Sequence, residues 1–212
     1  MSRKIDVGKA VLSKNDELAA HLRESFDRVG LKVINLVSSP GSGKTAWLQR
    51  TLESLQRQGR HAAALVGDLE TDRDAQRLAE SGAPVRQIRT QGMCHLEASM
   101  IQEHLKDWNL QGSELLFLEN VGNLVCPIGF DLGQHLKVLM LSTPEGEDKP
   151  LKYPPAFAWA NVVLISKMDM AEAAGFDLDF ALENIKKSNP KAIVIQTSAR
   201  TGQGLEDWLK LL

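Results

Sequence analysis

The 212-residue sequence predicts an α/β fold, a mostly parallel sheet with helices on both faces. Two observations indicate this class. Continuous apolar runs, which are typical of strands buried on both faces, alternate along the chain with segments whose apolar residues recur at helical spacing. The first apolar run also enters a glycine-rich turn and then a helical segment within residues 31–51. We find no repeat and no linker, so we expect a single domain over residues 1–212, with a short helical extension at about 1–30.

The expected elements can be placed in order along the chain. Ser13 and Asp16 resemble the start of a helix, which apolar residues at helical spacing continue as far as Gly30. Further helices are expected after the glycine-rich turn, over residues 73–81 and over residues 95–107. The remaining apolar runs are expected to be strands, with the sequences HAAALVGD, VRQIRT, ELLFLEN, LKVLMLS, NVVLISK and AIVIQTS. Ligands of such sheets bind beyond the carboxyl ends of the strands, and polar side chains follow several of these runs.

The glycine-rich turn, SSPGSGKT over residues 38–45, predicts a phosphate-binding loop. Gly41 and Gly43 let backbone N–H groups face a polyphosphate at the start of a helix, whose dipole favours anions. Lys44 is expected to reach the β- and γ-phosphates, and the Thr45 hydroxyl to bind Mg²⁺. At Ser38 the chain departs from the usual pattern, which has glycine there. The sequence therefore predicts a P-loop NTPase fold in which the nucleotide contacts Gly41, Ser42, Gly43, Lys44, Thr45 and Ala46.

Acidic residues and one glycine after later strands are expected to complete the phosphate site. Asp68 follows the second strand and suits the Mg²⁺ shell, to which Glu119 in FLENVGN also contributes. Asp72 is the residue that we expect to orient the attacking water, with Asp74 as the alternative. Gly122 offers a backbone N–H to the γ-phosphate, in a stretch that resembles the D-x-x-G element of GTPases. The predicted catalytic groups are thus Lys44, Asp72, Glu119 and Gly122.

Two later stretches indicate that the base is guanine. LISKMD resembles the N-K-x-D element of GTPases, with Ser166 where asparagine is usual. Asp169 would accept hydrogen bonds from guanine N1–H and the exocyclic amine, a pair that adenine does not offer, and Lys167 would lie along the base. TSARTG resembles the backbone element that supports guanine O6, through Ser198 and Ala199. We therefore expect GTP and GDP, rather than ATP, as the nucleotides.

A candidate metal site consists of Cys94, His95 and Cys126. Two thiolates and an imidazole suit Zn²⁺ or Ni²⁺. Adjacent residues of a helix point about 100° apart. Cys94 and His95, at the start of the helix expected over 95–107, would therefore serve one ion only at the helix end or across a subunit interface. The residues alone leave an alternative open, because free cysteine is often a small buried hydrophobic residue.

Five motifs resemble those of one family, and they cover most of the chain. SSPGSGKT, GDLETDRDA, GMCHLEA, ENVGNLVCP and EGEDKPLKYP occur in this order over residues 38–154. The chain is similar to the HypB family, the nickel-incorporation GTPases of [NiFe] hydrogenase maturation, in the nitrogenase-iron-protein-like branch of P-loop GTPases. The resemblance implies GTP hydrolysis, delivery of Ni²⁺, a GTP-dependent homodimer, and two partners, HypA and the hydrogenase large-subunit precursor. It also implies that Cys94, His95 and Cys126 bind Ni²⁺ or Zn²⁺ at the dimer interface, and that Lys152 points toward the partner subunit's nucleotide.

The order of these residues along the chain suggests how nucleotide and metal would communicate. Glu119, Gly122 and Cys126 share one short stretch, so a shift on GTP binding or hydrolysis would move the Cys126 sulfur. We therefore expect GTP to favour a dimer that completes the metal site, and hydrolysis to release Ni²⁺. Hydrolysis is expected to be slow, because no arginine finger is evident in the switch stretches.

Three other functions fit parts of the sequence. A urease accessory GTPase is the nearest, but that family has Cys-Pro-His where this chain has Cys94 and His95. A small-molecule P-loop kinase would prefer ATP and would need a pocket for a phosphoryl acceptor. A metal-binding scaffold would use its P-loop for assembly without hydrolysis.

Composition excludes several classes of partner. The 25 basic and 27 acidic residues nearly balance, which gives no electrostatic footprint for nucleic acid or an anionic membrane. No apolar run approaches the roughly 18 residues of a membrane-spanning helix, and MSRKIDVGKA lacks the apolar core of a signal peptide. Two cysteines make no disulfide framework, so we expect a reducing, cytoplasmic location. Many HypB proteins have an amino-terminal nickel-binding tract, whereas the first cysteine here is Cys94, so we expect no such high-affinity site.

Overall fold

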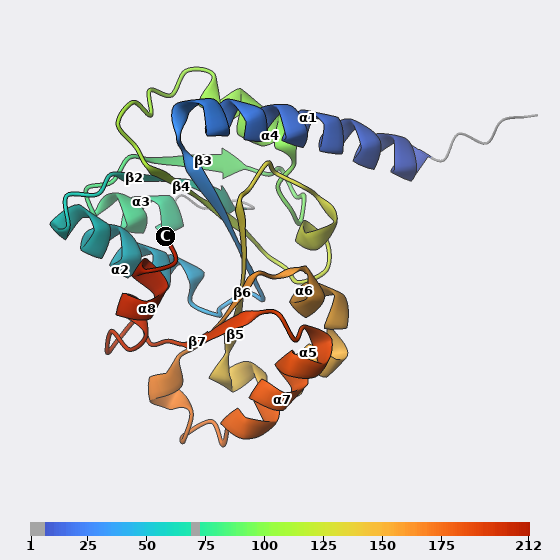
Figure 1. Ribbon diagram of the computed structural model, residues 1–212, viewed down its shortest axis with the longest axis vertical. Coiled ribbons are helices and arrows are strands. Elements are labelled where there is room, and N and C mark those ends of the chain that lie inside the picture. The colour runs from blue at the N-terminus through green and yellow to red at the C-terminus, as the bar shows by residue number, and fades with distance from the viewer. Residues whose placement is uncertain (1–6, 69–72) are drawn as a thin grey trace, which may run out of the picture.

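The computed structural model describes residues 7–68 and 73–212, and these residues fold around one parallel sheet (Figure 1). The sheet has seven strands in the order β3-β2-β4-β1-β5-β6-β7, and every neighbouring pair is parallel. The strands are β1 (Lys32–Ser38), β2 (Ala62–Asp68), β3 (Val85–Arg89), β4 (Leu115–Gly122), β5 (Leu136–Ser142), β6 (Val162–Ser166) and β7 (Ile193–Gln196). The predicted α/β fold is confirmed.

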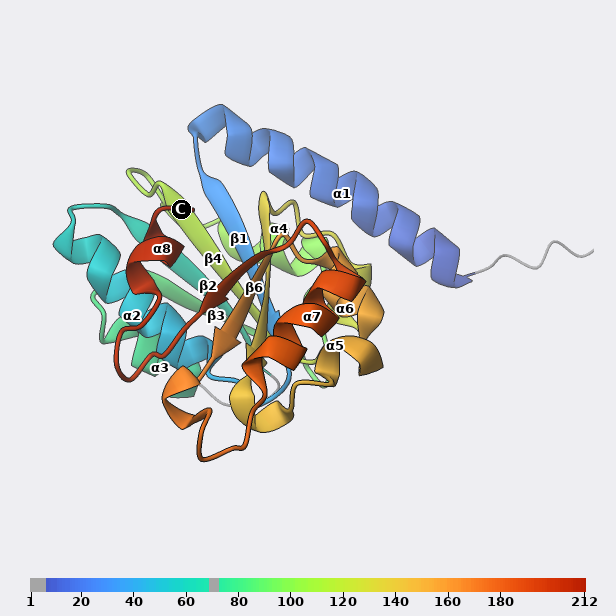
Figure 2. The same ribbon diagram turned by 60° about the horizontal axis from the view of Figure 1, so that its bottom comes forward.

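Helices connect the strands and cover both faces of the sheet (Figures 1 and 2). The α-helices are α1 (Val7–Val29), α2 (Lys44–Arg57), α3 (Arg73–Ala79), α4 (Ala98–Leu105), α5 (Lys149–Lys152), α6 (Pro154–Trp159), α7 (Leu178–Ser188) and α8 (Leu205–Leu209). Three 3-10 helices are η1 (Pro127–Gly129), η2 (Thr143–Glu145) and η3 (Met168–Met170). One face of the sheet packs against α2, α3 and α8. The opposite face packs against α1 and α4 on one side, and against α6 and α7 on the other.

Alternation along β4 decides which side chains face which layer. Leu115 and Phe117 belong to the core beneath α2, whereas Leu116 and Leu118 belong to the core beneath α1 and α4. All four side chains are at most 1% exposed, so both layers are closed to bulk solvent here. The residues that follow along β4 therefore have to serve both faces of the sheet.

The pairing of β4 with β1 is irregular near its carboxyl end. Leu36 pairs with Glu119, but Ser38 pairs with Gly122, so β4 accommodates one extra residue there. Such a bulge disrupts the ladder locally and turns side chains in new directions. Glu119, expected at the end of its strand, thus lies inside β4, with the bulge directly after it.

The helices agree with the prediction except at the start of α1 and before α4. The start expected at Ser13 and Asp16 is wrong, because α1 already begins at Val7. A helix was expected over residues 95–107, but α4 comprises only Ala98–Leu105, and Glu97 has extended backbone at φ −118° and ψ 156°. The prediction is wrong for the first three residues because the helix is capped from outside. Asn15 of α1 accepts a hydrogen bond from the Ala98 N–H at 2.9 Å. His95 and the preceding cysteine therefore belong to a loop.

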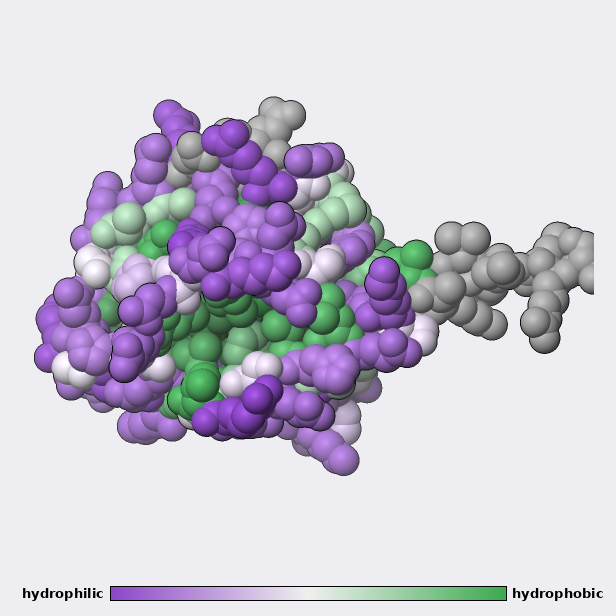
Figure 3. Space-filling model, turned by 90° about the horizontal axis from the view of Figure 1, so that it is seen from above, coloured by the Kyte–Doolittle hydropathy of each residue, from purple (hydrophilic) through white to green (hydrophobic). Residues whose placement is uncertain are grey.

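The surface has few large apolar features. The face in Figure 3 is mostly polar, and its largest group of apolar side chains lies in a central hollow. Within the described ranges, no helix is both long and apolar enough to cross a bilayer. The exposed large apolar residues are Val11, Leu12, Val29, Val125, Leu151, Met170, Phe180 and Ile193.

Candidate functional site

The phosphate-binding loop joins β1 to α2 at the carboxyl edge of the sheet. Gly41 and Gly43 have φ of +73° and +94°, which glycine adopts without strain and other residues rarely do. Gly43 is the N-cap of α2 and supplies no side-chain cap, so the helix start is open to a ligand. A pocket of about 390 Å³ lies against this helix start. Its lining includes the predicted residues Gly41, Ser42, Gly43, Lys44, Thr45, Ala46, Glu119 and Gly122.

Two polar pairs inside this pocket connect residues that are distant in the sequence. The Lys44 ammonium donates a hydrogen bond to Ser38 Oγ at 2.8 Å, and the Thr45 hydroxyl donates to Glu119 Oε1 at 2.7 Å. Ser38, which replaces the usual glycine, therefore holds the lysine beside the pocket. Thr45 and Glu119 bring two oxygen atoms together, and oxygen is the donor that Mg²⁺ prefers.

Of the other residues expected at the phosphate site, the structure places some at the pocket and leaves one undescribed. Asp68 is the last residue of β2, and Gly67 before it lines the pocket. Asp74, in the first turn of α3, also lines the pocket. Asp72 lies outside the described residues. Gly122 allows β4 to approach the loop closely, because a Cβ added there would lie 2.9 Å from Pro40 Cα.

A second pocket, of about 450 Å³, adjoins the first and contains the predicted base-reading residues. Lys167, Asp169 and Ala199 line it together with Ser42 and the start of α2. Lys167 has φ +59° and donates from Nζ to the Gly41 carbonyl at 2.8 Å. Ser198 lies behind the pocket, where its hydroxyl donates to Asp169 Oδ1 at 2.6 Å. The structure thus brings all four predicted residues to one place beside the phosphate pocket.

The sequence had not indicated how some residues support these pockets. The Ser166 hydroxyl donates to the Ser42 carbonyl at 2.8 Å, so serine holds the phosphate-binding loop from the position where asparagine is usual. Arg77 of α3 lines both pockets, and its Nε donates to Gln49 at 2.9 Å. Because Arg77 lies beyond the motif GDLETDRDA, no local pattern could have marked it.

Glu145 is a further supporting residue behind the phosphate-binding loop. The Ser42 hydroxyl lies 2.7 Å from Glu145 Oε2, which also accepts from the Ser142 N–H at 2.9 Å. Burial alone would raise the pKa of Glu145, but hydrogen bonds from Ser39, Ser142 and Ser42 outweigh it and lower the pKa. Glu145 is therefore an ionised group that fixes the loop. Its place in EGEDKPLKYP was the one available signal.

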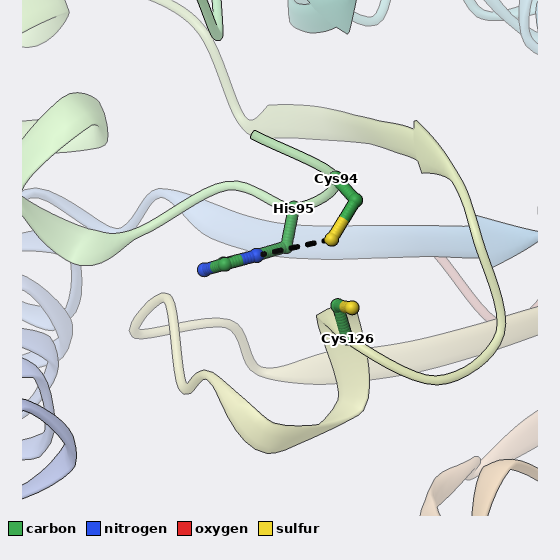
Figure 4. A group of neighbouring side chains, drawn as sticks. All are labelled: Cys94, His95 and Cys126. Carbon is green, nitrogen blue, oxygen red and sulfur yellow. Dashed lines mark hydrogen bonds between the residues drawn. The ribbon is translucent and has the colours of Figure 1, made fainter. Parts of the chain in front are cut away.

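The three candidate metal ligands meet in one chain (Figure 4). Cys94 and His95 come from the loop before α4, and Cys126 is the N-cap of η1. Their ligand atoms all lie within 4.8 Å of one another, and the Cys94 sulfur is 3.8 Å from His95 Nδ1. The expectation that the pair stands at the start of a helix is wrong, because neither residue is helical, so the 100° spacing of helical residues does not restrict it.

Neighbouring groups orient these ligands. The His95 ring stacks on Phe130 with centroids 3.9 Å apart, and its Nε2 lies 3.4 Å from Glu97 Oε1. A carboxylate beside Nε2 favours a proton there and leaves the Nδ1 lone pair facing the cysteines. The pKa of Cys94 is raised, first by its hydrogen bond with Cys126 and then by burial. Metal ligation requires thiolates, and a divalent cation beside the cluster favours loss of the Cys94 thiol proton, so the donor set of two sulfurs and an imidazole fits a divalent transition metal.

Lys152 lies away from both pockets. It belongs to the short helix α5, its side chain is exposed, and it pairs with Asp148 one turn earlier. Lys152 is absent from the described lining of the two nucleotide pockets. In its own chain it therefore does not face the nucleotide site.

Comparison with known proteins agrees with this geometry. A family model described as the CobW/HypB/UreG nucleotide-binding domain matches residues 32–196. The hydrogenase maturation factor HypB of Azotobacter vinelandii is 47% identical, and the match covers 98% of this chain and 68% of that protein. The hydrogenase/urease maturation factor HypB of Helicobacter pylori (strain 26695) is 42% identical over 98% of this chain and 86% of its own.

A solved structure gives the same result. The crystal structure of Helicobacter pylori HypB in complex with nickel superposes with a TM-score of 0.87, at 42% identity, over 93% of each chain. Both the fold and the sequence thus confirm the resemblance that the five motifs indicated. The chain belongs to the HypB family of hydrogenase maturation factors and carries their nucleotide-binding domain.

Proposed function

We propose that this chain hydrolyses GTP to GDP and phosphate and that it delivers Ni²⁺ during [NiFe] hydrogenase maturation. The observation that carries the proposal is the shared segment between the two candidate sites. Glu119 in the phosphate pocket and Cys126 in the metal cluster are separated by only the end of β4 and a short loop. A residue that responds to the γ-phosphate and a metal ligand are therefore close together on one segment of the chain.

The proposed hydrolysis follows from the phosphate pocket. Lys44 and the start of α2 bind the β- and γ-phosphates, and Gly122 donates its backbone N–H to the γ-phosphate. Thr45, Glu119 and Asp68 hold Mg²⁺, which neutralises charge on the phosphate oxygens. Asp72 orients the attacking water, and Asp74 is the alternative because it lines the same pocket.

The proposed nucleotide is GTP. Asp169 accepts from guanine N1–H and the amine, Lys167 lies along the base, and Ser198 with Ala199 supports O6. This assignment is supported by the fact that Lys167, Asp169 and Ala199 line one pocket beside the phosphate pocket. The alternative, a small-molecule kinase that prefers ATP, is not supported by a comparable set of residues in the described part of the chain.

Nickel is the proposed cargo of Cys94, His95 and Cys126. Thiolate and imidazole ligands suit both Ni²⁺ and Zn²⁺, and the Helicobacter pylori relative was crystallised with nickel. We propose a GTP-dependent homodimer that completes the coordination, with the exposed Lys152 reaching the partner subunit's nucleotide. HypA and the hydrogenase large-subunit precursor are the proposed partners in this delivery.

A nickel titration tests the proposal most directly. Wild type and Cys126→Ala are titrated with GDP and with a non-hydrolysable GTP analogue, while light scattering follows the mass. We expect wild-type affinity to differ between the nucleotides and Cys126→Ala to lose the difference. Val125→Ala, one residue away and exposed, is the matched control and should behave as wild type. Equal nickel affinity in both nucleotide states of the wild type would exclude the coupled carrier.

Hydrolysis and base choice need a separate assay. Phosphate release is measured with GTP and ATP, and the proposal requires turnover of GTP. A second candidate recipient is urease, because the Helicobacter pylori relative is a hydrogenase/urease maturation factor. Transfer of nickel from the loaded chain to apo-urease or to the hydrogenase precursor distinguishes the two.

A further inference from the structure

Two consecutive residues of β4 connect the candidate nucleotide site to the candidate metal site through opposite faces of the sheet. Glu119 follows Phe117 on the face beneath α2, where it contacts Thr45. Asn120 follows Leu118 on the opposite face, toward α4 and the loop that carries His95. Glu119 and Asn120 are 3% and 1% exposed, so both contacts are enclosed.

Asn120 is held by three hydrogen bonds. Its Oδ1 accepts from the Leu96 N–H at 3.1 Å and from the Val121 N–H at 3.0 Å. Its Nδ2 donates to Asn35 Oδ1 on β1 at 3.3 Å. Leu96 directly follows His95, so the amide of Asn120 ties the backbone of the metal-binding loop to the strand that carries Glu119.

A second contact holds the same loop against the nucleotide end of the sheet. Leu96 is fully buried, and a Cβ added to Gly67 would lie 2.7 Å from its Cδ2. Gly67 lines the phosphate pocket and precedes Asp68. Leu96 is thus enclosed between β2 and β4 at the point where both strands meet the phosphate pocket. A shift of either strand end has to move the residue next to His95.

The bulge in β4 interrupts the regular pairing with β1 directly after Glu119. The ladder is therefore locally disrupted at this end of the strand. Thr45 is hydrogen-bonded to Glu119 here, and binding of Mg²⁺ and nucleotide would change that contact. A movement of Glu119 would also move Asn120, because the two residues are adjacent in the chain. Asn120 is in turn hydrogen-bonded to Leu96 and to Asn35.

We infer that Asn120 is a positioning residue that transmits the state of the nucleotide site to His95 through the Leu96 backbone. The inference rests on the proposed coupling of nucleotide and nickel. It adds a route through the sheet, separate from the loop between Gly122 and Cys126. Removing Asn120 should therefore reduce the coupling and leave the three nickel ligands in place.

The test measures nickel affinity with GDP and with a GTP analogue in Asn120→Ala. The ratio of the two affinities is the coupling factor, and such factors are typically about 5- to 150-fold. We expect the ratio in Asn120→Ala to fall clearly below that of wild type without reaching one, because the route through the loop remains, while nickel still gives thiolate charge-transfer absorbance and GDP still binds. Asn120→Asp keeps the acceptor for Leu96 and should restore most of the ratio.

Two asparagines provide matched controls. Asn35→Ala removes the partner of Asn120 Nδ2 but leaves the bond to Leu96. Asn123→Ala removes a contact with the Cys94 carbonyl at 3.4 Å, on the separate route. Both should keep more of the coupling than Asn120→Ala. A wild-type ratio of one would refute the proposed function itself, whereas an unchanged ratio in Asn120→Ala would refute only the role of Asn120.

A measurement on the wild-type protein tests the same inference without relying on variants that could fold poorly. Hydrogen exchange of the Leu96 amide reports its bond to Asn120. It is measured without nickel, with GDP and with the GTP analogue, at concentrations where light scattering shows monomer. Leu96 protection should differ between the two states. Equal protection would overturn the inference, because the bond would then be insensitive to nucleotide.

Discussion

The nucleotide end and the metal cluster of this molecule are built in different ways. The nucleotide pockets are lined by charged groups that already have partners, such as Lys44 on Ser38 and Lys167 on the Gly41 carbonyl. These groups stand on strand ends and on a helix start. The metal ligands come from two loops, and their neighbours are a stacked ring and a carboxylate at 3.4 Å. The nucleotide site is thus preassembled on regular elements, whereas the metal site is a cluster of three ligands carried by loops.

This difference follows from what each ligand needs. A polyphosphate is bound by backbone N–H groups and fixed cations, and holding them rigidly avoids reorganisation when it binds. A metal that must be released is better served by ligands on loops, whose local stability is lower than that of the core. The two regions therefore predict different responses to substitution, and the predictions below are ordered from the largest expected effect to the smallest.

Lys44→Ala should impair GTP hydrolysis at the nucleotide site without changing nickel binding at the metal cluster. We expect kcat for GTP hydrolysis to fall by about 10²- to 10³-fold, because one preorganised donor to the transition state is lost. Nickel affinity of the nucleotide-free chain should stay unchanged. The exposed Lys210, which pairs with Asp207 and is not among the described lining of either pocket, gives the control Lys210→Ala. If Lys44→Ala weakened nickel binding without nucleotide, the two regions would not be separable.

Asp169→Asn tests the base pocket. The amide keeps the size of the side chain but cannot accept from both guanine groups, so GDP affinity should fall about 10- to 100-fold, the effect of a lost charged hydrogen bond. Xanthosine diphosphate, which has a carbonyl in place of the amine, should bind the variant better than wild type. Asp179→Asn on α7 is the control. Equal losses for both nucleotides would indicate damage to the pocket rather than altered base reading.

The features that could be predicted from the sequence are those that depend on local motifs, and the features that were missed depend on contacts between distant segments. The seven strands, the phosphate-binding loop and the base-reading residues were predictable because each motif is local and sits at a strand end. The start of α4 was not, because its cap is Asn15, whose side chain arrives from α1. Arg77, Glu145 and Asn120 were missed for the same reason, since their partners are distant in the chain. The cysteines and histidine were visible, but only the fold shows that one chain brings them together.

Glu97→Gln should weaken the metal cluster without touching the nucleotide end. The neutral amide supports the His95 tautomer less well, so nickel affinity should fall by about 10-fold, as for other groups behind a ligand. Isothermal titration with nickel measures this, and GDP affinity is the internal comparison. Glu103→Gln on α4 is the matched control. An unchanged nickel affinity would mean that stacking on Phe130 alone orients the ring.

The pH dependence of the cluster follows from the raised pKa of Cys94. Because its hydrogen bond with Cys126 is the largest cause, Cys126→Ala should lower the pKa of Cys94 toward its ordinary value. More thiolate is then present at a given pH, so alkylation of Cys94 by iodoacetamide becomes faster. In wild type, nickel affinity should rise with pH as the thiol protons are lost. Mass spectrometry across pH gives the alkylation profile, and an unshifted profile would contradict the assignment.

The smallest effect is expected at Ser166, which lines the base pocket and supports the phosphate-binding loop. Its hydroxyl holds the Ser42 carbonyl, and one neutral hydrogen bond contributes about 1 kcal/mol, or roughly fivefold in affinity. Ser166→Ala should therefore weaken GDP binding by about that factor, whereas Ser166→Asn, which offers an amide N–H in the same place, should stay close to wild type. Ser188→Ala on α7 is the control for a serine that bonds a carbonyl elsewhere, at Pro150. A large loss in Ser166→Asn would show that this pocket has been shaped around serine. Near-equality would show instead that the loop needs only a donor at this position.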